Sequence, residues 1–165
     1  MTLFFFVLGM VFAAIHIFRK PANVQEKHKK LEIILMYYIV FTIGITGLFA
    51  AYAHIFMANE VAQSIGWPTG SPFQTEVAFA NLAFGVLGVL CIWIREKFWL
   101  ATIIGSGVFL FADGIGHVVQ IVNNHDYAPN NAGIILYTDL IFPILGLILY
   151  FFYDLQLKKA QRQTN

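Results

Sequence analysis

Charged residues are scarce in this chain, and long apolar runs take their place. Asp, Glu, Lys and Arg make up 12% of the 165 residues, whereas hydrophobic residues make up 59%. A soluble domain would carry roughly a quarter charged residues. The few charges lie in short clusters between apolar runs, which predicts an integral membrane protein. The net charge of +1 gives no reason to expect a nucleic-acid partner.

Cysteine is nearly absent as well, because Cys91 is the single one, and this excludes an internal disulfide. The sequence also lacks an Asn-x-Ser/Thr acceptor for glycosylation. No basic residue precedes the first apolar run, and Arg19 and Lys20 follow it, which is the reverse of a cleavable signal peptide. We therefore expect a retained first span and a multi-pass protein of a prokaryotic inner membrane.

Five continuous apolar segments stand out, and the expected fold is all-α. A transmembrane helix needs ~20 apolar residues, and runs without alternation predict helices rather than barrel strands. We expect a polytopic bundle of five transmembrane helices in a single domain that covers residues 1–165. The expected helices cover about 2–18, 31–57, 73–94, 98–121 and 133–153.

The basic residues predict the orientation of this bundle. All ten Lys and Arg residues fall on one side of the five-span arrangement. The positive-inside rule makes that side cytoplasmic, so the N-terminus is expected outside and the C-terminus inside. The two expected outer loops, residues 58–72 and 122–132, contain no Lys or Arg.

Acidic and histidine side chains gather in the expected outer half, away from every basic residue. Asp113 and His117 are four residues apart, so they share one face of the fourth helix. At ~1.5 Å per residue, the candidate side chains lie ~5 to ~12 Å below the outer ends of four different helices. Ionisable groups at that depth suggest a function. The candidate site residues are Glu76, Asp113, His117, Asp139 and His54.

Carboxyl groups without a cationic neighbour are either protonated or balanced by a bound cation. Carboxylates together with imidazole suit Zn²⁺, Mn²⁺ or Fe²⁺. The first hypothesis is therefore a cation site that serves transport or sensing of a divalent metal ion or a proton. Its metal ligands would be the four residues Glu76, Asp113, His117 and Asp139, with His54 assisting.

Haem is disfavoured by the same residues. A haem site needs two facing histidines at matched depth, and only His54 and His117 qualify. No c-type attachment motif is present, and haem-binding bundles do not usually gather three acids beside the ligands.

Two other functions remain open. The same groups could activate water or move protons in a membrane-embedded enzyme that acts on a lipid or a quinone, with its catalytic residues unassigned. Alternatively, Asp113 and His117 merely satisfy each other by a hydrogen bond, and the chain is a structural or accessory subunit. Five spans are few for a complete transporter. We therefore expect the lipid bilayer and a homo-oligomer or larger membrane complex as partners.

Three short motifs resemble an uncharacterised prokaryotic membrane family, a domain of unknown function. They are Ser-Pro-Phe-Gln-x-Glu at 71–76, the Gly116–His117 pair and Tyr-Ala-Pro-x-Asn-Ala-Gly at 127–133. The resemblance covers about residues 30–150. It implies a small multi-span helical protein, and it implies no activity.

Overall fold

The computed structural model describes residues 1–19 and 27–164, and all regular structure in these ranges is helical. Five helices are long and apolar enough to cross a membrane, one of them the continuous helix Lys27–Phe56. The all-α fold class and the five apolar helices predicted from the sequence are thus confirmed. In chain order the elements are α1 (Thr2–Arg19), α2 (Lys27–Tyr38), the π-helix η2 (Ile39–Ile45), α3 (Thr46–Phe56), α4 (Ala58–Ile65), α5 (Phe73–Leu90), α6 (Lys97–Asn124) and α7 (Ile134–Thr164).

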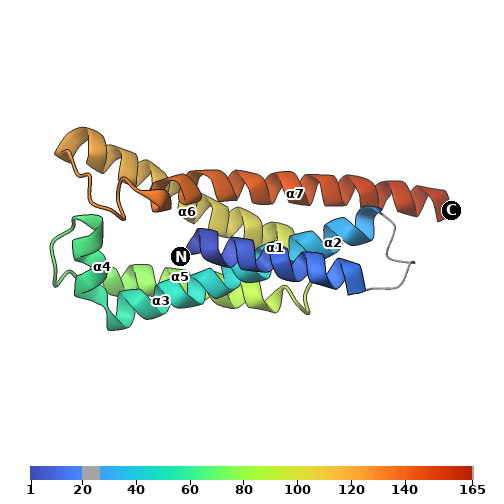
Figure 1. Cartoon of the computed structure of the whole chain (residues 1–165), viewed down its shortest axis with the longest axis horizontal. Helices are drawn as coiled ribbons and strands as arrows, with labels where there is room; N and C mark the ends of the chain where they lie inside the picture. Colours follow the sequence, from blue (N-terminus) through green and yellow to red (C-terminus); the bar gives the residue numbers. More distant parts are fainter. Residues whose placement is uncertain (20–26, 165) are drawn as a thin grey trace.

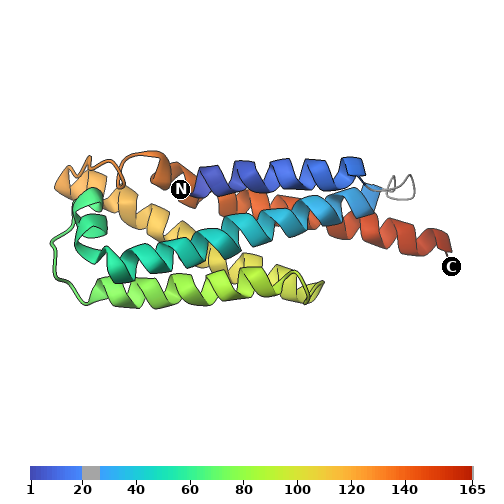
Figure 2. The same cartoon turned by 60° about the horizontal axis from the view of Figure 1, so that its bottom comes forward.

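The helices form two closely packed pairs, α3 with α5 and α6 with α7 (Figure 1). Figures 1 and 2 both show the pairs meeting near the α5–α6 turn and diverging toward the opposite end. We call that opposite end, made of α4 and residues 125–133, the α4 end. The other end, with the α5–α6 turn and the start of α2, is the basic end. Helix α1 packs against α2 and η2, with the N-terminus partway along the bundle (Figure 2).

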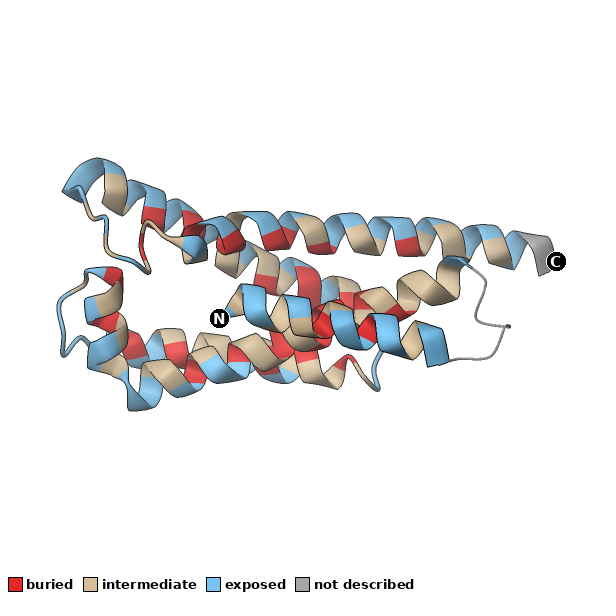
Figure 3. Cartoon of the chain, in the orientation of Figure 1, coloured by how far each residue is buried: buried red, intermediate tan, exposed pale blue. Residues whose placement is uncertain are grey.

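An apolar core holds the helices together in the half toward the basic end. Trp99 is fully buried there, and its indole Nε1 donates a hydrogen bond to the Cys91 carbonyl oxygen at 2.8 Å. Figure 3 shows buried positions in the middle of the bundle. The core cluster consists of Leu35, Tyr38, Ile39, Ile43, Cys91, Trp99, Ile103 and Tyr153.

Glycines allow the close approach of η2 and α3 to α5. A Cβ atom on Gly88 would lie 2.5 Å from the Gly44 nitrogen, and one on Gly85 would lie 2.7 Å from the Leu48 nitrogen. Neither gap accommodates a side chain, because non-bonded heavy atoms pack at about 3.5–4.0 Å. Small residues at such crossings are the usual way for apolar helices to associate in lipid.

Several helix boundaries differ from the sequence prediction. The third expected helix ends at Leu90 rather than 94. The carbonyl oxygen of the following residue, Cys91, accepts a hydrogen bond from the Trp99 indole. The last two helices are longer than expected and end at Asn124 and Thr164. The polar end of α7 continues as a helix, with Lys158 Nζ 2.6 Å from Asp154 Oδ2 one turn away.

The expected loop 58–72 contains a helix that the hydropathy pattern did not predict, and in this respect the prediction was wrong. Helix α4 is too short and too polar to register as an apolar run, but it buries Ala62 and Ile65 on one side. It ends at Ile65 and is capped by Gly66, whose φ of 87° is a left-handed conformation that favours glycine.

Candidate functional site

His117 on α6 and Asp139 on α7 form a buried pair. The His117 Nε2 atom lies 3.7 Å from Asp139 Oδ2, and both side chains are 9% exposed. Gly114, one turn before His117, permits this approach, since a Cβ atom there would lie 2.7 Å from Leu140 Cδ2. The glycine on α6 therefore allows α7 to lie close enough for the two ionisable groups to face each other.

Asn131 fixes the orientation of the imidazole. The His117 Nδ1 atom lies 2.7 Å from Asn131 Oδ1, and Asn131 Nδ2 donates to the Asp126 carbonyl oxygen at 2.7 Å. Because that second bond makes Nδ2 the donor, Oδ1 is the acceptor, and Nδ1 of His117 carries a proton. The remaining ring nitrogen, Nε2, is therefore the one that faces Asp139.

Asp113 completes the cluster from one turn earlier on α6. It is half-buried, and it interacts electrostatically with both His117 and Asp139. The sequence from residue 98 to residue 157 contains no Lys or Arg, so no basic side chain of α6 or the membrane-length part of α7 offsets the two carboxyl groups. Three of the five candidate residues are thus brought together as the Asp113–His117–Asp139 cluster.

Glu76 lies outside this cluster. It is exposed, whereas the buried face of α5 carries Gln74, Ala78, Gly85 and Gly88. Glu76 follows Gln74 by two positions, which turns it about 200° around the helix axis. Glu76 therefore points away from the face through which α5 packs against its neighbours, and the structure does not bring it to the other candidate residues.

His54 belongs to the other helix pair. Its Nδ1 atom lies 2.6 Å from Oε1 of Gln74, and this contact joins α3 to the start of α5. His54 and His117 are therefore each hydrogen-bonded through Nδ1 to a different amide side chain, on different helix pairs.

The five-residue metal-ligand set predicted from the sequence is not assembled. Within residues 1–19 and 27–164, no group of three or more His, Cys, Asp or Glu side chains has an arrangement that could hold a metal ion. What the cluster offers is one imidazole and two carboxyl groups that are close enough to influence one another's charge.

Two important residues were missed as site candidates. Asn131 is fully buried, and Gln74 is 2% exposed, although both are polar. Each lies within a motif that the sequence analysis singled out, the runs at 127–133 and 71–76. Buried polar side chains need hydrogen-bond partners. The amide residues in these two motifs were therefore the signal in the sequence that could have indicated partners for the histidines.

Comparison with known proteins identifies a family but no activity. The chain matches the family described as "Family of unknown function (DUF6790)" over residues 1–159. This confirms the resemblance to an uncharacterised family. No curated protein and no solved structure matches the chain.

Proposed function

Since the chain belongs to this family of unknown function, membership supplies no activity, and we propose one from the site. The protein is a proton-binding membrane protein that senses or transports protons through the Asp113–His117–Asp139 cluster. The observation that carries this proposal is the buried 3.7 Å approach of His117 Nε2 to Asp139 Oδ2, with the imidazole held from its other side by Asn131.

The chemistry of the cluster favours a proton as the bound cation. With Nδ1–H committed to Asn131, an additional proton resides on Nε2 or on a carboxyl oxygen. Ionising both carboxyl groups without that proton would leave two negative charges with no basic neighbour from α6 or the membrane-length part of α7. Burial opposes such unbalanced charge, so the cluster binds a proton and gains or loses it as a coupled unit.

The charge pattern gives the proposed orientation. The basic residues of the described chain lie at the end of α1, the start of α2, the α5–α6 turn with the start of α6, and the end of α7, and the positive-inside rule favours the cytoplasm for them. The α4 end then faces outward, the N-terminus is outside, and the cluster lies in the outer half of a prokaryotic inner membrane. Protons from the outer aqueous phase reach the cluster at this end.

Infrared titration of the purified protein in lipid tests the proposal. Between pH 4 and pH 9 the wild type is expected to show a carboxylic-acid band that disappears as the cluster releases its proton. Asp139→Asn keeps the size of the side chain and removes the titrating group, so this band should be lost or displaced. His125→Asn is the matched control, because His125 is an exposed loop residue at a φ of 53°, a conformation that Asn tolerates.

The other outcomes identify the competing functions. An identical titration in wild type and Asp139→Asn, with only a loss of thermal stability, would leave the cluster a purely structural contact. Stoichiometric Zn²⁺ binding that is lost in His117→Ala would instead support a divalent metal site. Proton flux into liposomes that carry a pH-sensitive dye then separates transport from sensing.

A further inference from the structure

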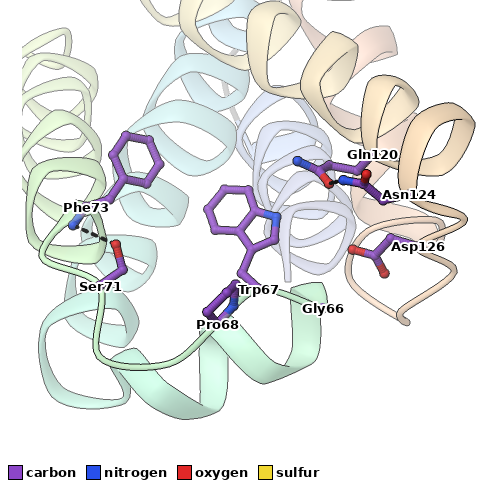
Figure 4. A pocket seen from close by; sticks show the side chains of 8 residues that line it. All are labelled: Gly66, Trp67, Pro68, Ser71, Phe73, Gln120, Asn124 and Asp126. Carbon is purple, nitrogen blue, oxygen red and sulfur yellow. Dashed lines mark hydrogen bonds between the residues drawn. The ribbon is translucent and has the colours of Figure 1, made fainter.

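A cavity of about 750 Å³ opens at the α4 end, between the α4–α5 loop and the last turn of α6. Figure 4 shows its two walls facing each other, with aromatic side chains on one and polar side chains on the other. Ligand pockets are commonly ~300–1,000 Å³, so the space suits a small molecule. Its lining residues are Gly66, Trp67, Pro68, Ser71, Phe73, Gln120, Asn124 and Asp126.

The two walls are fastened to each other next to the cavity. Asn130, in the α6–α7 loop, donates from its backbone nitrogen to the Ser64 carbonyl oxygen at 3.0 Å. Its side-chain Nδ2 donates to Ser64 Oγ at 2.9 Å. These bonds connect the loop to α4, so the cavity is a built feature of the fold and not a gap between two independent loops.

Asp126 gives the cavity a negative charge without a protein counter-ion. One carboxylate oxygen, Oδ1, accepts the Ala128 N–H at 3.0 Å, which holds the side chain in a local turn. Residues 58–72 and 122–132, which include α4 and most of both loops, contain no Lys or Arg. Among the described residues Asp126 forms no ion pair. A cationic ligand would therefore be attracted, and an anionic one would be repelled.

The opposite wall offers aromatic faces and an unsatisfied donor. The ring centroids of Trp67 and Phe73 are 5.9 Å apart, and such rings attract ammonium groups. The Trp67 Nε1–H is buried and has no acceptor among the described residues. Figure 4 shows its nitrogen edge turned toward the side of Gln120 and Asn124.

Gln120 adds a second donor. Its Oε1 accepts from Asn124 Nδ2 at 2.5 Å, so the carbonyl end is occupied and the amide NH₂ remains. In Figure 4 that nitrogen is turned toward Trp67. The Trp67 Nε1–H is buried without an acceptor, whereas the Gln120 amide is only partly buried. Two N–H donors on one side of the cavity match an oxygen acceptor on a ligand.

We propose that this cavity binds a small ammonium compound that carries an oxygen acceptor, of the amino-alcohol class. The ammonium group lies between the Asp126 carboxylate and the aromatic rings. The oxygen accepts from Gln120 and, after a small rotation of the indole that uncovers its buried N–H, from Trp67. An ammonium without oxygen leaves the donors unused, and a neutral diol leaves the carboxylate without a cation. Ethanolamine presents this chemistry either as the free molecule or as the headgroup of a lipid.

Binding of three matched probes to the full-length protein in detergent tests the assignment by saturation-transfer NMR. Ethanolamine is expected to bind at least about fivefold more tightly than ethylammonium, which lacks the oxygen, or ethylene glycol, which lacks the charge. Glycerophosphoethanolamine distinguishes the sources: tighter binding than ethanolamine identifies a lipid headgroup, and weaker or equal binding identifies the free amino alcohol.

Asp126→Asn is the decisive variant, because an Asn oxygen still accepts the Ala128 N–H while the charge is removed. It should weaken ethanolamine binding by about tenfold, the effect of losing a charge-assisted contact. Glu60→Gln is the matched control, since Glu60 is an exposed acid on α4 outside the cavity lining, and it should leave binding unchanged.

Trp67→Phe provides an independent second variant. It keeps an aromatic face and removes the N–H, so it should reduce the preference for ethanolamine over ethylammonium. Equal binding of the three probes, absence of binding by all of them, or unchanged affinity in Asp126→Asn would each overturn the proposal.

Discussion

The two halves of the bundle bury different kinds of side chain. Toward the basic end the core consists of Trp99, Leu35, Ile103 and their apolar neighbours. In the half toward the α4 end the buried positions include His117, Asn131 and Asp139. Apolar packing is non-directional and depends on volume, whereas each buried polar group needs a partner in a defined direction. The first half therefore holds the helices together, and the second half carries the specific geometry that a binding function requires.

Removal of the largest core side chain, in the apolar half, should cause the largest loss of stability. Trp99→Ala deletes a fully buried ring and the Nε1 bond to the Cys91 carbonyl, and it should destabilise the fold by about 3–5 kcal/mol. Unfolding in detergent with increasing SDS measures the loss. Trp93→Ala is the control, because Trp93 is 69% exposed in the described chain. If Trp99→Ala lost less stability than Trp93→Ala, the apolar half would not be the main source of stability.

Loosening the α4 end should have a smaller effect that stays local. Asn130→Ala removes the side-chain bond to Ser64 Oγ, and a single hydrogen bond contributes about 0.5–1.5 kcal/mol. Hydrogen exchange should become faster in residues 58–73 and 125–133, with the protection around Trp99 unchanged. Gln63→Ala, at an exposed position on α4, should not produce this change. Faster exchange throughout the chain would contradict the separation into two halves.

The third predicted effect is of similar size to the second and has the opposite sign. Thr42 in η2 is 3% exposed, and its Oγ1 has no hydrogen-bond partner among the described residues. Thr42→Val removes that hydroxyl and keeps the branched shape, so it should raise stability by about 1 kcal/mol. Thr46→Val is the matched control, because Thr46 Oγ1 donates to the Phe41 carbonyl at 3.1 Å and its loss should not stabilise. A lower melting temperature for Thr42→Val would show that its hydroxyl is bonded after all.

The sequence determined the helices well because long apolar runs leave the backbone no alternative to a helix in lipid. Asp113 and His117 lie one turn apart on α6, as their spacing within one helix requires, whereas the close approach of Asp139 to His117 depends on the packing of α7. The rotation of α5 about its axis was not predictable from its own residues. It depends on how Gly85 and Gly88 meet the neighbouring helix, and this contact leaves Glu76 on the exposed side of α5. Asn131 depends on the path of a loop, which hydropathy does not encode.

Helix α4 shows the same limit on a smaller scale. Its burial of Ala62 depends on tertiary contact, whereas its composition resembles an ordinary polar connection. Motifs were more informative than hydropathy at this end, because Gln74 and Asn131 both lie in runs noted for their residue pattern. The hydrogen bonds of these two amides to the candidate residues His54 and His117 became evident only in the structure.

The π-helix η2 lets one continuous helix serve two sets of neighbours. Before it, α2 packs against α7, with Tyr38 Oη donating to the Phe142 carbonyl at 2.5 Å; after it, α3 packs against α5. A π-helical turn holds more residues than an α-helical turn, so η2 shifts the phase between the two contact faces. Deleting one residue within η2 would rotate His54 by about 100° relative to Tyr38 and carry it away from Gln74. The number of residues in this segment therefore sets the rotation of α3 relative to α2, so that both helices present their contact faces to the correct neighbours.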